Sequence, residues 1–311
     1  MVNRLASGAR GASFDVDIER GKIGEFARAI GARHPAYFAR DAACSPPTFL
    51  ATIFFWEDRV PGANPWSQVE MSQERGMHAE QVYELPDGPP RAGERLRATS
   101  EITGIWDKES RSAGTLTFVQ MTTTFVDDGG RVRARALLTG VETARAPERA
   151  AEGAASDRPE APSGDGAWID PLGEPLSEEE LKPGLTLEPR RFGPLTRTDV
   201  VRYQGASGDM NPVHHDEPFA RRSGFPAPLG VGMLTAGLMA SRAVDRIDPA
   251  WVREIRIRWK KPVFPGELLS FGGSVVGRDG TKVTLALVGR DGAGDEVVSG
   301  GLTLDVAGGG A

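Results

Sequence analysis

The fold of this 311-residue chain is decided by two stretches, GVGMLTAGLMASRAV at residues 230–244 and EIRIRWKKP at 254–262. The first is apolar on nearly every face, which predicts a helix that is buried on all sides. The second alternates strictly between apolar and charged residues, which predicts a strand with one buried face. A buried helix followed by a sheet is typical of the α+β class, and we expect the sheet to wrap about the helix.

Two further pairs of stretches predict β-hairpins, because in each pair two strand-like runs flank an Asp-Gly turn. In the first half of the chain, LTFVQMTTTFV and RVRARALL flank DDGG. In the second half, KVTLALVGR and EVVSGGLTL flank DGAGD. The strands are therefore expected to be antiparallel.

The two halves of the chain repeat the same landmarks in the same order. Residues 30–43, IGARHPAYFARDAA, align with residues 207–220, SGDMNPVHHDEPFA, and share a glycine, a proline and an alanine. A P-x-x-x-G-E-x-L motif then occurs at 89–96 and again at 262–269. Each half closes with its own hairpin, so we interpret the halves as tandem copies of one fold.

The composition changes between the two copies. Residues 146–184 are rich in Pro, Gly, Ala, Ser and acidic residues and lack apolar periodicity. Such a segment cannot bury enough surface to offset the entropy of ordering it, so we expect a linker with one helical turn at SEEEL. This linker separates an N-terminal domain, 1–145, from a C-terminal domain, 185–311.

Composition also narrows the functional class. The net charge is −6 and the sequence has no basic tail, which argues against a nucleic-acid partner. No apolar run reaches the length of a membrane span. The single Cys44 excludes an intramolecular disulfide and fits a reducing compartment, so we expect a cytoplasmic location. The N-terminal residues include Arg and Ser, which would also fit a presequence that targets an organelle. We favour the interpretation that they are a frayed terminus.

The stretch SGDMNPVHHDEPFA holds candidate catalytic groups. Asp209 and His214 are five positions apart, with Asn211-Pro212 between them. A regular helix would turn the two side chains about 140° apart, whereas a proline-containing turn can direct both to one point, as acid–base catalysis requires. Gly232 begins the predicted buried helix, whose free N–H groups would bind a ligand oxygen. In the alternative interpretation these residues only form a turn.

The other histidines and the cysteine are expected to be structural. His215 would point away from the candidate pair, and Asp216 would cap a short helix. His34 and His78 are expected at the surface or in hydrogen bonds beside loops and strand starts. Cys44 has no activating neighbour in the sequence, so we expect an inert thiol.

The second half resembles the MaoC-like dehydratases, the (R)-specific enoyl-CoA hydratase family. The residues that carry this resemblance are YQGASGDMNPVHHD, GFPAPLGVGML and RWKKPVFPGELL. The first half, with GEFARAIGARHPAYF, PPTFL and PPRAGERL, resembles the N-terminal dehydratase module of double members of the family. The resemblance implies a tandem (double) hot-dog fold, in which each antiparallel sheet wraps around a long central helix. The halves would form an intramolecular pseudo-dimer, and further homo-oligomerisation stays open.

The resemblance also implies an activity, the reversible dehydration of a (3R)-3-hydroxyacyl-CoA or acyl-carrier-protein thioester to a trans-2-enoyl thioester and water. In this family the motif's aspartate and histidine form the acid–base pair, and the glycine before Met-Leu holds the thioester oxygen through its N–H. These roles pass to Asp209, His214 and Gly232, with Asn211 as a member of the site network.

The sequence departs from the family pattern at three positions. Val231 stands where family members commonly have histidine. Ala32 and Tyr37 stand where the first copy would hold the carboxylate and the imidazole, and a tyrosine with a pKa near ~10 is a poor base. We therefore expect a non-catalytic first copy that shapes the acyl tunnel. Its FLATIFFW segment, 49–56, would supply apolar wall or serve only as core.

No cofactor is expected, because the substrate is carried on CoA or phosphopantetheine. The histidines and the cysteine lack zinc-like spacing, and runs such as GGSVVG lack the context of a phosphate loop. Arg256, Arg258, Lys260 and Lys261 form a basic strand edge that could meet the substrate's phosphates, although a solvated outer face is the favoured explanation.

Two other functions stay open at this point. The first is a hot-dog acyl-CoA thioesterase, although such sites usually centre on one carboxylate without a histidine five residues later. The second is a non-catalytic acyl-binding or scaffold protein, as expected of the first copy.

Overall fold

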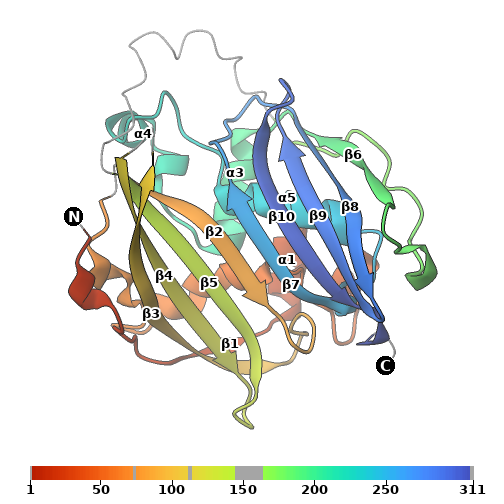
Figure 1. The fold of residues 1–311 in the computed structure, drawn as a ribbon, viewed down its shortest axis with the longest axis horizontal. Helices are drawn as coiled ribbons and strands as arrows, with labels where there is room; N and C mark the ends of the chain where they lie inside the picture. The colour runs from red at the N-terminus through yellow and green to blue at the C-terminus, as the bar shows by residue number, and fades with distance from the viewer. Residues whose placement is uncertain (1, 73–74, 111–113, 144–163, 309–311) are drawn as a thin grey trace.

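The computed structural model describes residues 2–72, 75–110, 114–143 and 164–308. Within these ranges, ten strands form one antiparallel sheet in the order β1-β3-β4-β5-β2-β7-β10-β9-β8-β6 (Figure 1). The strands of the first copy are β1 (Phe14–Asp17), β2 (Gly76–Glu84), β3 (Arg95–Ser110), β4 (Gly114–Val126) and β5 (Val132–Thr143). Those of the second copy are β6 (Thr186–Phe192), β7 (Val252–Trp259), β8 (Leu269–Asp279), β9 (Lys282–Arg290) and β10 (Glu296–Asp305). Both predicted hairpins are confirmed, as β4–β5 and β9–β10.

The two copies join through the pairing of β2 with β7, so they share a single sheet. β7 therefore lies in the middle of the sheet, and the expectation of a basic strand edge is wrong. Arg256 and Arg258 point to the outer face, where both form ion pairs with Glu80 of β2. Lys260 and Lys261 pair with acidic residues at the start of β10 and in the β9–β10 turn. A charged outer face accounts for Arg256 and Arg258, whereas Lys260 and Lys261, beyond the end of β7, also line the large cavity described below.

The predicted buried helix is confirmed as α5 (Gly232–Val244), of which every residue from Leu234 onward is buried. Figure 1 shows α5 behind β8, β9 and β10, against the inner face of the second copy's half of the sheet. The inward residues of β7, Ile255 and Ile257, are also fully buried, as their alternation predicts.

The first copy differs from the expectation, because it lacks a long central helix. The segment that corresponds in order to α5 forms a 3₁₀ turn, η3 (Phe49–Ile53), and a single helical turn, α2 (Phe54–Glu57). Pro46-Pro47 precedes this segment and Pro61-Gly62 follows it. Proline cannot continue a helix and restricts the residue before it, so the segment has no room to lengthen. The inner face of the first copy's half of the sheet is therefore less filled.

Three shorter helices complete the inner layer: α1 (Arg20–Ala29), α3 (Arg197–Ser207) and α4 (Glu217–Arg222). Thr196 caps α3 in a reciprocal capping box with Asp199. Asp216 caps α4 as predicted, because its side chain accepts a hydrogen bond from the Phe219 N–H. None of the helices in the described ranges is long and apolar enough to cross a membrane.

Part of the expected linker packs onto the domains. Trp168 is buried and donates a hydrogen bond of 2.8 Å to the Gly31 carbonyl of the first copy. Leu176 and Leu181 are also buried, so this stretch does bury apolar surface, contrary to expectation. The helical turn at SEEEL is present as η5 (Glu178–Glu180). Residues 146–163 of the expected linker lie outside the described residues, and the domain boundaries themselves stay a prediction.

Candidate active site

The candidate catalytic residues lie on the bend that follows α3. Gly208 ends α3 with a φ of 79°, a left-handed conformation that favours glycine. Asn211 then caps the short 3₁₀ helix η6 (Pro212–His214), because its Oδ1 accepts a hydrogen bond from a backbone N–H two residues on. The chain reverses between α3 and η6, which brings Asp209 and His214 to the same side of the bend.

The carboxylate and the imidazole face each other. His214 Nε2 lies 4.0 Å from Asp209 Oδ2. His214 Nδ1 lies 3.3 Å from the carbonyl oxygen of Leu229, which assigns the proton to Nδ1 and leaves Nε2 with a free lone pair. A gap of this size admits a bridging water or hydroxyl group. The arrangement therefore suits two groups that share one reacting oxygen.

The surroundings of His214 favour its neutral form. Burial lowers the pKa of His214 below its ordinary value, and the nearby Asp209 carboxylate opposes this only in part. A neutral imidazole with a free Nε2 can accept a proton at neutral pH. His214 is thus poised as a base.

Gln204 is a supporting residue that the sequence analysis did not identify. Its side-chain amide donates hydrogen bonds to the backbone carbonyls of Asp209, at 2.8 Å, and Asn211, at 3.3 Å. Its Oε1 pairs with His215 Nδ1 at 3.1 Å, so His215 bonds to Gln204 and not to the candidate pair. The available signal in the sequence was a single amide residue on a predicted amphipathic helix, and it is too general to predict this role.

The N-terminus of α5 meets the same site. Gly232 is its first residue, and the N-cap Val231 makes no side-chain cap hydrogen bond. The first N–H groups of a helix have no partner inside the helix and can bind a ligand oxygen. The indole of Trp259 donates a hydrogen bond of 2.9 Å to the Gly232 carbonyl, and a Cβ on Gly232 would lie 3.2 Å from that indole nitrogen. A larger residue at this position would therefore crowd the indole, which would have to shift by a few tenths of an ångström.

One cavity of about 880 Å³ connects these groups. Asp209, Asn211, His214 and Gly232 all line it, so the structure brings together every predicted site residue. The first copy supplies most of the apolar wall, from Leu50, Ala51, Ile53, Phe54, Trp66, Met71, Met121, Leu138 and Val141. The FLATIFFW segment contributes to this wall and, through Phe49 and Trp56, to the core.

His78 also lines the cavity, whereas the sequence analysis placed it at the surface or in a routine hydrogen bond. Its ring lies 4.3 Å from the ring of Trp259, measured between centroids. Burial lowers the pKa of His78 to about 4, and its Nε2 has no hydrogen-bond partner among the described residues. Its location follows from the pairing of β2 with β7, which no local pattern in the sequence reveals.

The other two predicted structural residues behave as expected. His34 Nδ1 accepts a hydrogen bond from the Ala36 N–H and so caps the 3₁₀ helix η2 (Pro35–Phe38). Cys44 is buried, and burial raises the pKa of its thiol to about 12. A thiol that stays protonated at neutral pH is unreactive.

The corresponding place in the first copy holds no acid–base pair. Ala32 and Tyr37 are both buried there. They lie near the C-terminal end of α5, where Asp245 accepts hydrogen bonds from the Arg33 and His34 N–H groups. The C-terminal end of a helix carries partial negative charge and cannot stabilise an oxyanion. This environment supports the expectation that the first copy is non-catalytic.

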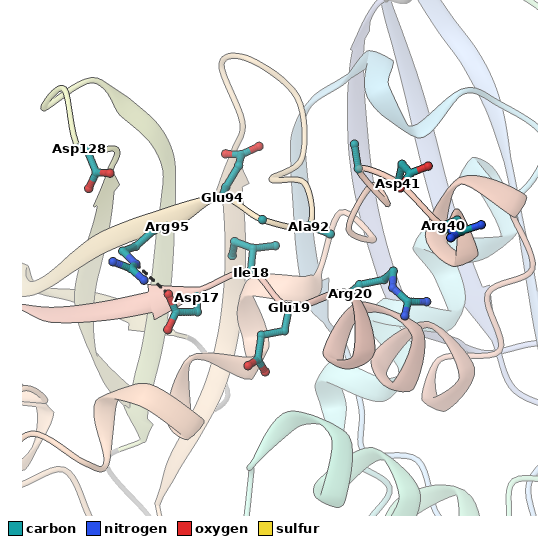
Figure 2. Close-up of a pocket in the computed structure, with 12 residues that line it drawn as sticks. Asp17, Ile18, Glu19, Arg20, Arg40, Asp41, Ala92, Glu94, Arg95 and Asp128 are labelled. Atoms are coloured by element: carbon teal, nitrogen blue, oxygen red, sulfur yellow. Dashed lines mark hydrogen bonds and ion pairs between the residues drawn. The ribbon is translucent and has the colours of Figure 1, made fainter.

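A second hollow, of about 780 Å³, lies away from these groups and is open to solvent (Figure 2). It is lined by charged side chains of both signs, among them Arg20, Arg40 and Glu94. Figure 2 shows Arg95 paired with Asp17, at 3.1 Å, across β1 and β3. This hollow contains none of the predicted catalytic residues, so we do not consider it a candidate active site.

Comparison with known families finds a match in each half of the chain. The family model described as MaoC like domain matches residues 179–292. The model described as FAS1-like, dehydratase domain region matches residues 6–135. Among curated relatives, the enoyl-CoA hydratase ChsH3 of Mycobacterium tuberculosis is 25% identical over 279 residues, which cover 89% of this chain and 86% of the relative.

Solved structures share the fold. A MaoC-like dehydratase superposes with a TM-score of 0.75 at 23% identity, over 96% of this chain and 98% of that one. A Mycobacterium tuberculosis protein described as having a double hotdog fold superposes with a TM-score of 0.59 at 14% identity, over 97% and 99% of the two chains. The predicted α+β double hot-dog fold is confirmed. The chain thus carries a MaoC-like domain in its second half and a FAS1-like dehydratase region in its first.

Proposed function

We propose that this protein is a hydro-lyase that reversibly hydrates and dehydrates acyl-CoA thioesters at the Asp209–His214 pair. The observation that carries the proposal is the geometry of that pair. Its two side chains lie 4.0 Å apart on the wall of a large cavity that also contains the N-terminus of α5. The relative ChsH3, whose name is enoyl-CoA hydratase, aligns over most of both chains and supports the same activity.

The proposed mechanism begins at the thioester carbonyl. The free N–H groups at the start of α5, that of Gly232 first, would bind the carbonyl oxygen and stabilise the negative charge that develops on it. One such donor is typically worth about 3–4 kcal/mol in the transition state. This stabilisation makes the α-proton of the acyl group acidic enough for a side chain to remove.

Asp209 and His214 would then transfer the protons. In dehydration the Cα–H and Cβ–O bonds break, the Cα=Cβ bond forms, and the proton taken from Cα leaves with the hydroxyl group as water. The pair ends with the protons it began with. Asp209 and His214 lie on the same side of the bend, which supports a syn reaction. We further propose the (3R) configuration for the hydroxyacyl substrate and the trans-2-enoyl configuration for the product, as the family resemblance implies.

We propose that protein groups suffice for this chemistry and that no metal or redox cofactor takes part. The substrate would be carried on CoA or on the phosphopantetheine of an acyl-carrier protein. We retain the prediction of a cytoplasmic location and of an intramolecular pseudo-dimer that can assemble further into a homo-oligomer.

The proposed function is tested with crotonyl-CoA, whose conjugated enoyl thioester absorbs in the ultraviolet. Loss of that absorbance would support a hydratase, release of free thiol would indicate a thioesterase, and binding without either would indicate an acyl-binding protein. We expect Asp209→Asn and His214→Ala each to lower kcat/KM at least about 100-fold while the fold is retained. Tyr37→Phe, in the non-catalytic copy, is the control and should change kcat/KM little. Near-normal turnover in either variant of the pair would contradict the mechanism.

A further inference from the structure

The far end of the cavity, on the sheet of the first copy, is polar. The cavity extends from Trp259 on β7, beside the start of α5, past β2 and β5 to Thr123 on β4. Neighbouring strands lie about 4.8 Å apart, so β4 is three spacings, or about 14 Å along the sheet, from β7. The wall between them is largely apolar, with Ala136, Leu138 and Met121, which suits an acyl chain.

Glu57 lies at this far end and lines the cavity, with only 2% of its surface exposed. Its Oε2 accepts a hydrogen bond of 3.1 Å from the side-chain amide of Asn64. Its Oε1 accepts a longer one, of 3.5 Å, from the hydroxyl of Ser100, which itself lies 2.9 Å from the hydroxyl of Thr123. These partners are all neutral, and among the described residues no cation contributes to the electrostatics of the Glu57 carboxylate.

A buried carboxylate with only neutral partners is unfavourable unless further donors reach it. A carboxylate has about four lone-pair sites, and the two hydrogen bonds to Glu57 fill only half of them. Burial accordingly raises the pKa of Glu57 to about 7. A ligand group that donates a hydrogen bond to this carboxylate would supply what the protein does not.

We propose that the cavity selects acyl thioesters whose acyl group carries a hydroxyl at its far end, and that Glu57 binds this hydroxyl. The inference rests on the proposed function, because it places the thioester carbonyl at the start of α5 and the acyl chain along the cavity. A terminal methyl group would leave Glu57 without a further donor. At pH 8, where Glu57 is largely ionised, a terminal carboxylate would face a second carboxylate and would be repelled.

The inference is tested with three trans-2-enoyl-CoA thioesters of equal length that end in a methyl, a hydroxyl or a carboxylate group, over a series of chain lengths. At the chain length that reaches Glu57, we expect kcat/KM for the hydroxyl-ended substrate to exceed that for the methyl-ended one at least about tenfold. The reason is that the hydroxyl group can donate a hydrogen bond to the Glu57 carboxylate and the methyl group cannot. The carboxylate-ended substrate should be the poorest. Equal kcat/KM for the hydroxyl- and methyl-ended substrates at every length would overturn the inference.

Two variants locate the selectivity. Glu57→Leu, which keeps the volume but removes the carboxylate, should reverse the hydroxyl-to-methyl preference, and Glu57→Gln, which keeps the shape, should weaken it. Glu84→Gln, on the outer face of the neighbouring strand β2, is the matched control and should leave the preference unchanged. Circular dichroism and thermal unfolding establish that each variant is folded. A preference that survives in Glu57→Leu would place the hydroxyl elsewhere.

A binding measurement separates this inference from the proposed function. Calorimetry with saturated acyl-CoA and its hydroxyl-ended analogue needs no turnover, and we expect the analogue to bind at least about tenfold more tightly. If crotonyl-CoA is not hydrated but the analogue binds more tightly, the proposed function fails and the binding preference stands. If crotonyl-CoA is hydrated and the two ligands bind equally, the selectivity for a hydroxyl fails alone.

Discussion

At the scale of single residues, burial shifts the pKa values of two groups that line the cavity, His214 and Glu57. Burial lowers the pKa of His214, while the Leu229 carbonyl holds the proton on its Nδ1. The same physical cause acts in the opposite direction on Glu57, because burial disfavours the charged form of either group. The cavity therefore favours the uncharged form of both groups.

We expect the fall in kcat/KM at acidic pH to follow the protonation of the His214 imidazole. If neutral His214 is required, kcat/KM for crotonyl-CoA reaches half of its maximum at a pH below 6.5, because burial lowers the pKa of His214 below the ordinary value of 6.5. The measurement is kcat/KM across pH 4.5–8, with enzyme stability checked at each pH. A half-maximal rate above pH 7 would contradict this assignment.

Glu57 should make the fold less stable as pH rises. Its pKa is about 7 in the folded state against an ordinary value of 4.5, so between these values the folded state binds more protons than the unfolded state. The contribution of Glu57 to the free energy of unfolding therefore falls from pH 4.5 to pH 7 and levels off above. We expect Glu57→Gln to raise the free energy of unfolding by about 3 kcal/mol at pH 8 and to change it little at pH 4.5. Urea unfolding at the two pH values measures this difference, and an equal effect at both would contradict it.

At the scale of elements, the two ends of α5 decide which copy carries the site. Its N-terminus, at Gly232, lies in the cavity with the acid–base pair. Its C-terminal end, at Asp245, lies near Ala32 and Tyr37 of the first copy. The first copy offers no long helix of its own, because proline residues bound the segment that contains α2. One helix therefore contributes to one site, and the space left in the first copy forms part of the cavity.

The close contact between α5 and the first copy can be tested by adding a methyl group to α5. A Cβ on Gly237 would lie 2.4 Å from Cγ2 of Ile30, just beyond the end of α1. We expect Gly237→Ala to lower the free energy of unfolding by roughly 1–3 kcal/mol, because overpacking outweighs the gain in helix propensity of about 1 kcal/mol. Gly205→Ala in α3, where a Cβ would meet no atom within 4 Å, is the control and should stabilise the protein slightly. Thermal unfolding measures both, and a Gly237→Ala variant as stable as Gly205→Ala would refute the close contact.

At the scale of the whole molecule, the two copies are one structural unit. They share a continuous sheet through the β2–β7 pairing and a hydrophobic core that includes residues of both. The indole of Trp168, between the copies in sequence, donates a hydrogen bond to Gly31 of the first. The cavity likewise needs both copies, since the second supplies Asp209 and His214 and the first supplies His78 and most of the apolar wall.

A shared core and sheet should unfold cooperatively. We expect tryptophan fluorescence and far-ultraviolet circular dichroism to report the same single transition on urea unfolding. The slope of the free energy against urea concentration should correspond to the surface of the whole chain and not to that of one half. Two resolved transitions would mean that the copies fold independently.

The sequence by itself determined the local elements and which residues meet at the candidate site. Apolar periodicity predicted α5 and β7, the Asp-Gly turns predicted the hairpins, and the motif around Asn211 predicted that Asp209 and His214 would meet. These features depend on residues close together in the chain, where backbone geometry leaves few alternatives.

Only the tertiary structure decided what lies around the pair. His78 and Trp259 are far apart in sequence and meet through the pairing of β2 with β7. Glu57 reaches the far end of the cavity because the segment that contains α2 is too short to fill the first copy's half of the sheet. Such contacts depend on strand order and on how two similar copies join. A local pattern of residues does not encode them, because the same alternation fits any neighbouring strand.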